Sequence, residues 1–489
     1  MAISGGHTPG QSGHVTDHNL IDAAIAAKAA STALTAEISR ATTAEAAAIT
    51  TAGTNADTKI AAQHSVDNST YVAGVVAGAG IDPTGAADST TALNAALTAA
   101  TGKVAHLPKG TYLLSGISIP AGTKVYCYGS TLKAKTNAGA TLVTMAAGTE
   151  LRDATLDGNR TNQSVVQDGI LTTGHAVIRG CTIKDVSSRG VTTSGFTGAL
   201  EIVDTVFTNV ISYPIACYGT DVLKVTRCTI TFDPALTARD VNGDLPRAIL
   251  PYGVGSVIVT GCYINCGRKY RDGIWHTGCT ESIITGNTIC ETQDDQITYG
   301  GGLSRAVISG NILRGSNTTG GVVVLGGGGT IYDMAITGNT IADCGGAGIQ
   351  LSDVNGLTIS GNIIDGCIDG VREIAGSLTN VTITGNTFKA VTGSGVLLET
   401  ATDIQVDGNH ITNSGGSGCG ISPGYTLGLI VNGNTFHSAT SSAGYFGAIA
   451  AGTPNNVIVT NNLLIACTNG FSFEGGVTNK VVANNLTAV

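Results

Sequence analysis

Short runs of alternating apolar and polar residues fill the last two thirds of the chain, and these runs repeat. Each copy has an alternating segment, then Gly-Asn, then a β-branched or aromatic pair, a glycine turn and a second short apolar segment. Alternation with a period of two residues predicts β-strands that bury one face. The clear copies centre on seven asparagines spaced 23 to 28 residues apart: Asn287, Asn311, Asn339, Asn362, Asn386, Asn409 and Asn434.

A repeat of this length has room for three short strands and three turns in each turn of a solenoid. Stacked coils join strand to strand at a spacing of ~4.8 Å. An asparagine at the same turn of every coil can then hydrogen-bond its neighbours above and below. For residues 116–489 we therefore predict an all-β fold, a single-stranded parallel β-helix of about 13–14 coils.

The pattern changes twice towards the N-terminus. Residues 19–66 are rich in alanine and carry an imperfect heptad, which predicts an α-helical coiled-coil stem. We expect three copies of this stem to associate; a solvated single helix or linker is the alternative, and a dimer stays open. Residues 67–115 read as a neck and capping helix, with Leu93 and Leu97 on its apolar side and a strand at Val104–Leu107.

Two segments carry family resemblances. Residues 82–116, including Pro108-Lys109-Gly110-Thr111-Tyr112, and the repeats themselves resemble pectin-lyase-like right-handed β-helices of phages and bacteria. The turn-rich leader in residues 1–18 resembles the N-terminus of minor tail proteins from phages of actinobacteria. Together these resemblances imply a bacteriophage tailspike on the virion tail. Such a protein would be a homotrimer that joins a tail or baseplate protein through its N-terminus and engages a host cell-surface polysaccharide.

Composition narrows the range of partners. The formal net charge is −9, which opposes binding to nucleic acid. The first residues have no basic and apolar signal sequence, and no long apolar run occurs, so we expect synthesis in the host cytoplasm and no membrane insertion. Several of the twelve cysteines occupy equivalent repeat positions, as Cys181, Cys228 and Cys262 do. They are typical of small stacked core residues, and we predict neither a metal nor another cofactor.

Candidate chemistry gathers in two successive coils. Asp272 stands in "RDGIW", and Asp294 and Asp295 stand in "QDDQI" one coil later, in the corresponding turn. Stacking at the strand spacing brings these carboxylates together, and mutual repulsion raises the pKa of one of them. A protonated acid beside an ionised carboxylate is the pair that glycoside hydrolysis requires.

Residues around the acids suit sugar binding. Trp275, the only tryptophan, is placed to stack on a sugar ring, and Arg271, Lys269 or His276 to hold an anionic sugar. The coil before them is about ten residues longer than its neighbours, and such excursions tend to carry binding residues. The predicted substrate-binding residues are Trp275, His276, Arg271, Lys269, Glu291, Asp244 and Arg247.

The acids resemble the motifs of the polygalacturonase family of glycosidases, which implies catalytic roles for Asp272, Asp294 and Asp295. This chain has Tyr270-Arg271 in place of the family's Asn-Thr, Gly320-Gly321 near its His motif, and no Arg-x-Lys beyond. Three interpretations stay open: a depolymerase that is a glycosidase or a lyase, a non-catalytic receptor-binding or structural tail protein, and simple turn residues. Asp168-Gly169 and Asp369-Gly370 place an aspartate in the same turn of other coils without a comparable cluster around it.

Overall fold

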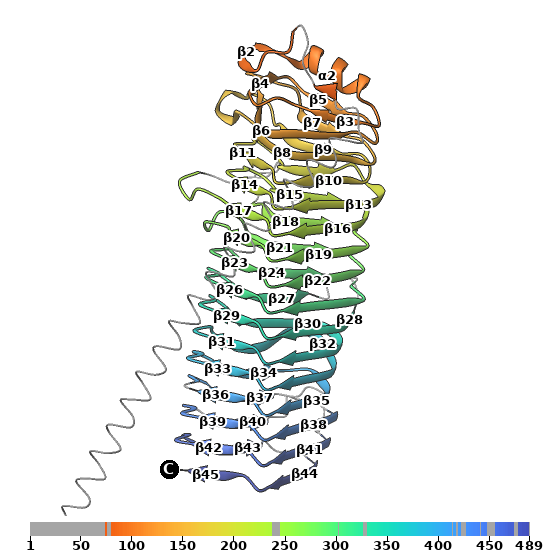
Figure 1. Cartoon of the computed structure of the whole chain (residues 1–489). Helices are drawn as coiled ribbons and strands as arrows, with labels where there is room; N and C mark the ends of the chain where they lie inside the picture. Colours follow the sequence, from red (N-terminus) through yellow and green to blue (C-terminus); the bar gives the residue numbers. More distant parts are fainter. Residues whose placement is uncertain are drawn as a thin grey trace, which may run out of the picture. The chain divides into compact units, whose positions relative to one another are not determined.

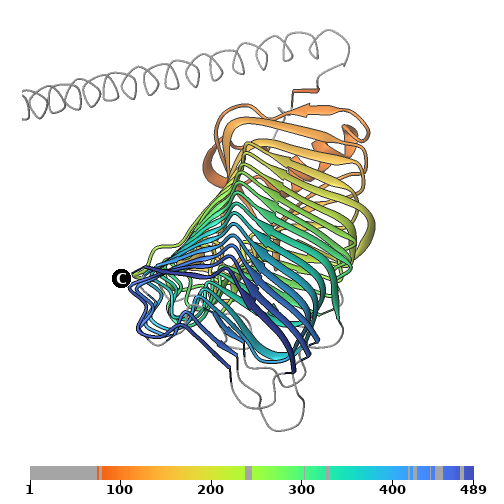
Figure 2. The same cartoon turned by 90° about the horizontal axis from the view of Figure 1, so that it is seen from below.

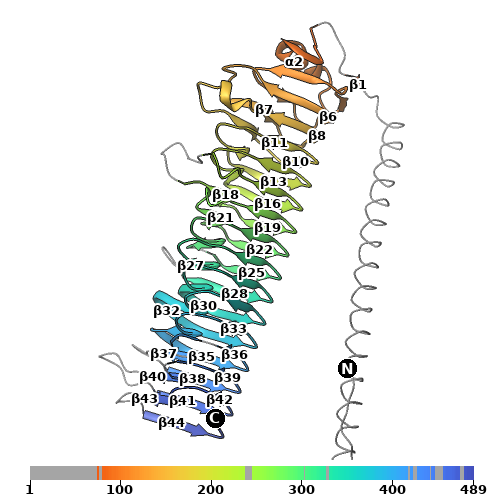
Figure 3. The same ribbon diagram turned by 90° about the vertical axis from the view of Figure 1, so that its left-hand side faces the viewer.

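The computed structural model describes residues 74–75, 80–236, 245–301, 303–325, 330–412, 414–416, 419–421, 427–440, 442–446, 455–473 and 478–488. The predicted leader and stem, residues 1–66, and Asp244 lie outside these residues. From Ala73 onward the chain forms one compact unit. This unit is a rod of parallel coils stacked along one axis (Figures 1 and 3).

Each coil contributes strands to three parallel sheets that run the length of the rod, and Figure 2 shows the coils superimposed along its axis. The first sheet contains β5 (Ile117–Ile119), β7 (Thr141–Met145), β9 (Asp168–Thr172), β12 (Val191–Thr193), β15 (Ile215–Tyr218), β18 (Arg247–Tyr252), β21 (Asp272–Thr277), β24 (Ile297–Gly300), β27 (Val322–Leu325), β30 (Ile349–Ser360), β32 (Val371–Thr384), β34 (Val396–Leu398), β37 (Cys419–Ile421), β40 (Gly444–Phe446) and β43 (Phe471–Phe473).

The second sheet contains β1 (Gly74–Val75), β3 (Val104–His106), β6 (Lys124–Ala134), β8 (Thr149–Asp157), β10 (Ala176–Arg179), β13 (Phe196–Val203), β16 (Thr220–Thr226), β19 (Ser256–Thr260), β22 (Glu281–Thr285), β25 (Arg305–Ser309), β28 (Ile331–Thr337), β35 (Ala401–Asp407), β38 (Leu427–Asn432), β41 (Asn455–Thr460) and β44 (Thr478–Ala483). The long strands β30 and β32 bend from the first sheet into the second.

The third sheet contains β2 (Thr84–Asp88), β4 (Thr111–Leu114), β11 (Thr182–Lys184), β14 (Val206–Thr208), β17 (Thr229–Thr231), β20 (Tyr263–Asn265), β23 (Thr288–Cys290), β26 (Ile312–Arg314), β29 (Thr340–Ala342), β31 (Ile363–Asp365), β33 (Thr387–Lys389), β36 (His410–Thr412), β39 (Thr435–His437), β42 (Leu463–Ile465) and β45 (Leu486–Ala488). Strands β6 and β8 cross from the second sheet into it. The predicted parallel β-helix is thereby confirmed, with about 15 turns.

A ladder of buried asparagines sets the register between coils. The Nδ2 group of Asn311 donates to Oδ1 of Asn339 at 2.9 Å and to the carbonyl of Ile284 in the preceding coil, also at 2.9 Å. The backbone N–H of Asn311 donates to the same Oδ1 of Asn339. This pattern repeats from Asn287 to Asn485, so every amide in the ladder is satisfied where it is buried. The ladder is the one predicted from the repeat.

The N-terminal end of the rod is covered by a short helix, α2 (Thr90–Ala99), whose Leu93 and Leu97 are buried. Ser89 precedes the helix, but its hydroxyl accepts a hydrogen bond from the N–H of Asp82 and does not cap the helix. The capping role falls to Asp88, whose carboxylate accepts the N–H of Thr90 at 2.9 Å. The helix predicted from the apolar pattern is confirmed.

Candidate active site

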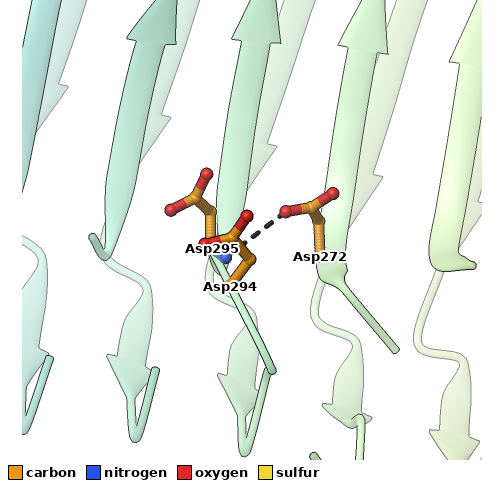
Figure 4. Close-up of side chains that lie close together, drawn as sticks. All are labelled: Asp272, Asp294 and Asp295. Atoms are coloured by element: carbon orange, nitrogen blue, oxygen red, sulfur yellow. Dashed lines mark hydrogen bonds between the residues drawn. The ribbon is translucent and has the colours of Figure 1, made fainter. Parts of the chain in front are cut away.

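Three carboxylates meet where the first sheet begins, in two adjacent coils. Asp272 is the first residue of β21, and Asp294 and Asp295 lie in the turn before β24. Strands β21 and β24 pair in parallel register, so the turns before them stack (Figure 4). One carboxylate oxygen from each residue lies within 4.8 Å of the others. The predicted stacking of the acids is confirmed.

Asp272 is the most deeply buried of the three, with 1% of its surface exposed. Its Oδ1 accepts the backbone N–H of Asp295 at 3.3 Å, and its Oδ2 pairs with Nε of Arg247 at 3.2 Å. Burial raises the pKa of Asp272 to about 7, and the neighbouring charge of Asp295 adds to the rise. The guanidinium of Arg247 opposes this shift but does not cancel it.

Asp295 is 6% exposed and is held by the coil that follows it. Its Oδ1 accepts the N–H of Gly320 at 3.0 Å and contacts the hydroxyl of Thr319, and its Oδ2 accepts the hydroxyl of Thr298 at 3.0 Å. Burial raises the pKa of Asp295 to about 6, although the hydrogen bond from Thr319 lowers it in part. Asp295 therefore keeps a proton at pH values where an ordinary aspartate has lost it.

Asp294 behaves in the opposite way. Burial alone would raise its pKa, but hydrogen bonds from Thr319, Thr318 and Arg271 outweigh burial and hold the pKa of Asp294 below its ordinary value. Its Oδ1 accepts the hydroxyls of Thr318 at 2.7 Å and Thr319 at 2.5 Å, and its Oδ2 accepts Nε of Arg271 at 3.2 Å. With a side chain 20% exposed, Asp294 is an ionised carboxylate that reaches solvent.

The Thr319 hydroxyl lies between Oδ1 of Asp294 and Oδ1 of Asp295. A hydroxyl has one proton, so it donates to one of these oxygens at a time, and either carboxylate can accept it when ionised. The donated hydrogen bond favours the ionised form and lowers the pKa of the carboxyl that accepts it.

Trp275 lies beside the acids on the outer surface of β21, half-buried. The guanidinium of Arg247 is 3.5 Å from the centroid of its ring, and that of Arg271 is 5.4 Å away. One face of the indole is thus occupied by a cation within the protein. The carboxylate oxygens are close enough to share a cation, but Arg247 and Arg271 already pair with Asp272 and Asp294 and oppose a further positive charge there.

Other predicted binding residues are placed differently. The prediction that His276 holds a sugar from the surface is wrong: its side chain points inward, is 2% exposed and stacks on Tyr299 with ring centroids 4.6 Å apart. Strand alternation explains this, because His276 follows the outward-facing Trp275. Glu291 pairs with Arg268 at 2.7 Å and does not join the acids. Lys269 is half-buried in the turn before β21.

Sequence reasoning missed the residues that hold the acids in place. They are Thr298, Thr318, Thr319 and Gly320. Thr318 and Thr319 follow Asp294 by 24 and 25 residues, which is one coil. That spacing is the signal that could have found them.

Aspartates at the position equivalent to Asp272 in other coils have a structural role. Asp168 forms a two-pronged pair with Arg189, at 3.0 Å to Nε and 2.6 Å to the second guanidinium nitrogen. Asp369 accepts the N–H of Ser394 at 2.7 Å and pairs with Arg372. Each is a single acid satisfied by its neighbours, whereas Asp272, Asp294 and Asp295 are three acids in contact.

Comparison with known proteins supports the fold. A family model described as "Right handed beta helix region" matches residues 247–409, and one described as "Periplasmic copper-binding protein (NosD)" matches residues 334–488. No curated protein sequence matches this chain. In the described part of the chain, no helix has the length and hydrophobicity needed to span a bilayer.

Solved structures extend this comparison to most of the rod. The tailspike protein of the E. coli bacteriophage HK620, in complex with a pentasaccharide, aligns with a TM-score of 0.52 and 14% identity over 82% of this chain and 78% of its own. A mutant of that tailspike in complex with a hexasaccharide aligns with a TM-score of 0.50 and 13% identity over 82% of this chain and 77% of its own. The chain therefore has the right-handed parallel β-helix fold that these phage tailspikes have.

Proposed function

We propose that this chain is a tailspike-type phage tail protein that binds a host-surface polysaccharide and hydrolyses it at Asp294 and Asp295. The observation that carries the proposal is the contact of three carboxylates with opposite pKa shifts, whereas Asp168 and Asp369 occupy the same turn of other coils as single acids. Paired acids of this kind are the machinery of glycoside hydrolysis. The fold similarity to an oligosaccharide-bound tailspike supports the substrate class.

The environments of the acids assign their roles. Asp295, protonated up to about pH 6, donates its proton to the glycosidic oxygen as the bond to the sugar breaks. Asp294, ionised and the more exposed, either activates the attacking water or attacks the sugar carbon itself. Asp272 is too deeply buried to touch a polysaccharide, and it positions Asp295 by accepting the N–H of that residue. The structure thus favours Asp295 over Asp294 as the acid.

The assembly belongs to the same proposal. Residues 19–66 would form the trimeric stem, and residues 1–18 would join the virion tail through a tail or baseplate protein. Linking three rods raises the effective affinity for a repeated surface polymer through avidity, with no new contact needed. This arrangement suits a protein that must find a sparse glycan on a cell.

The test is reducing-end release from purified bacterial capsular, O-antigen and cell-wall polysaccharides by the full-length protein. D295N and D294N are expected to lose at least about 100-fold in rate, because each removes one half of the acid and base pair. D369N is the matched control, since it changes an aspartate in the same slot of another coil. Equal rates for D295N and the unmodified protein would contradict the catalytic assignment.

A non-catalytic receptor-binding protein is the second candidate. The low exposure of Asp272 and Asp295, 1% and 6%, favours it, because a polysaccharide must reach a catalytic acid. This candidate predicts glycan binding without release of reducing ends, and unchanged binding by D295N. Binding with turnover would reject it.

A further inference from the structure

Two tyrosines continue the outer surface of the first sheet beyond Trp275, towards the N-terminal coils. Tyr252 ends β18 and Tyr218 ends β15, and the two residues face each other in the strand register. Their ring centroids are 6.3 Å apart and the rings are tilted by 50°. Tyr252 has 55% of its surface exposed. Tyr218 is half-buried, so the pair is an aromatic surface that is most open at Tyr252.

This surface lies diagonally across the sheet from Trp275, which flanks the acid cluster. Tyr252 pairs with Thr277, two residues beyond Trp275 on the next strand. A strand spacing of ~4.8 Å and a rise of ~3.3 Å per residue place Tyr252 roughly 8 Å from Trp275 along the diagonal. On the opposite side of Trp275, the next strand carries Thr298 and Gly300 at the corresponding positions. The aromatic surface thus extends from Trp275 in one direction across the coils.

A tyrosine can stack on a sugar ring, a contact that Trp275 can make with only one face. The face of Trp275 beneath Arg247 is closed to a ligand, whereas more than half of the surface of Tyr252 is exposed. The face of a tyrosine ring packs against the C–H groups of a pyranose, and its hydroxyl exchanges hydrogen bonds with sugar hydroxyls. The coil spacing is comparable with the length of one pyranose unit, so adjacent coils can contact adjacent sugars.

We propose that Tyr252 and Tyr218 form a sugar-stacking platform, on which the polysaccharide lies across the coils from the acid cluster towards the N-terminal end of the rod. The proposal rests on the proposed polysaccharide-binding function and specifies the direction in which the bound polysaccharide runs. It also assigns binding residues outside the acid-rich coils.

The experiment begins with an array of bacterial capsular, O-antigen and cell-wall polysaccharides probed with the full-length protein. Fragments of increasing length are then prepared from the bound polysaccharide, and their affinities are measured by calorimetry. Y252A and Y218A are each expected to weaken binding of the longest fragments by about 3- to 10-fold, the range of one aromatic stacking contact. The loss should shrink as the fragments become too short to reach from the acids to Tyr252.

Y332A is the matched control, because Tyr332 is 49% exposed but lies on β28 of the second sheet. Affinity equal to that of the unmodified protein in Y252A would overturn the platform while leaving the proposed function intact. A changed oligomeric mass of Y252A would also overturn it and identify the tyrosines as a contact between copies. If the unmodified protein bound nothing on the array, the proposed function would fail and the platform with it.

Discussion

Replacing Thr319 by valine removes one hydroxyl and keeps the branched shape of the side chain. That hydroxyl contacts both Asp294 and Asp295 and lowers the pKa of each. Its loss should raise both pKa values. A hydrogen bond to a charged group contributes about 1.5 kcal/mol, which corresponds to about one pKa unit. In T319V the pKa of Asp295 should therefore rise from about 6 to about 7.

The pH dependence of hydrolysis reports this shift. Asp295 must be protonated to act as the acid, so kcat/KM of the unmodified protein should fall about tenfold per pH unit above about pH 6 and be about 100-fold below its plateau at pH 8. In T319V the fall should begin about one pH unit higher. At pH 8 this variant should retain about ten times more of its own plateau activity than the unmodified protein does.

The assay is the initial rate of reducing-end release from about pH 2.5 to pH 9, which covers both limbs. T318V is the control, because the Thr318 hydroxyl contacts Asp294 and not Asp295. It should shift only the acid limb, which reports the ionisation of Asp294. An alkaline limb that stays in place in T319V, or moves equally in both variants, would refute the assignment of Asp295 as the acid.

Three further predictions concern stability and assembly. Asp272 has a pKa of about 7 in the folded protein against an ordinary value of 3.8, so its ionisation opposes folding increasingly from about pH 4 to pH 7, by roughly 4 kcal/mol in total. D272N removes this pH dependence, so its unfolding temperature should rise relative to that of the unmodified protein between pH 5 and pH 8, whereas D369N is the control aspartate from the same position of another coil. N362A removes the oxygen that accepts hydrogen bonds from the backbone N–H and from Nδ2 of Asn339. It should lower the free energy of unfolding, measured by chemical denaturation, by about 2–4 kcal/mol, while T358A on the surface should lower it little. Deleting residues 19–66 should convert trimers to monomers in mass photometry, and a full-length protein that is monomeric at micromolar concentration would contradict the stem.

The fold was predictable because every coil repeats the same local information. The position of Asn311 in its repeat was enough to predict its contacts with Asn339, since one coil of sequence equals one step along the rod. The stacking of Asp272 on Asp295 followed from the same rule. A periodic chain therefore reveals which residues are neighbours without any long-range reasoning.

The direction and environment of each side chain were harder to predict. The side chain of His276 is of a type that often binds ligands, yet the alternation along the strand points it into the core. Arg247 looked free to bind substrate, but it neutralises Asp272 and covers Trp275. Both outcomes depend on which face of a strand a side chain takes, and around a corner of the coil the alternation restarts. A repeat gives the neighbours of a residue more readily than its orientation.

The energetics of the acid cluster also argue against a purely structural turn. Asp168 shows how an aspartate in this turn stabilises the rod. Its carboxylate accepts hydrogen bonds from two guanidinium nitrogens of Arg189. Asp272 and Asp295 are instead buried with pKa values raised to about 7 and about 6, so near neutral pH their ionisation weakens the folded state. Asn in either position would keep the size of the side chain and remove this ionisation, although it would leave one acceptor oxygen in place of two. Buried acids that weaken the folded state near neutral pH, with pKa values in that range, are characteristic of catalytic sites.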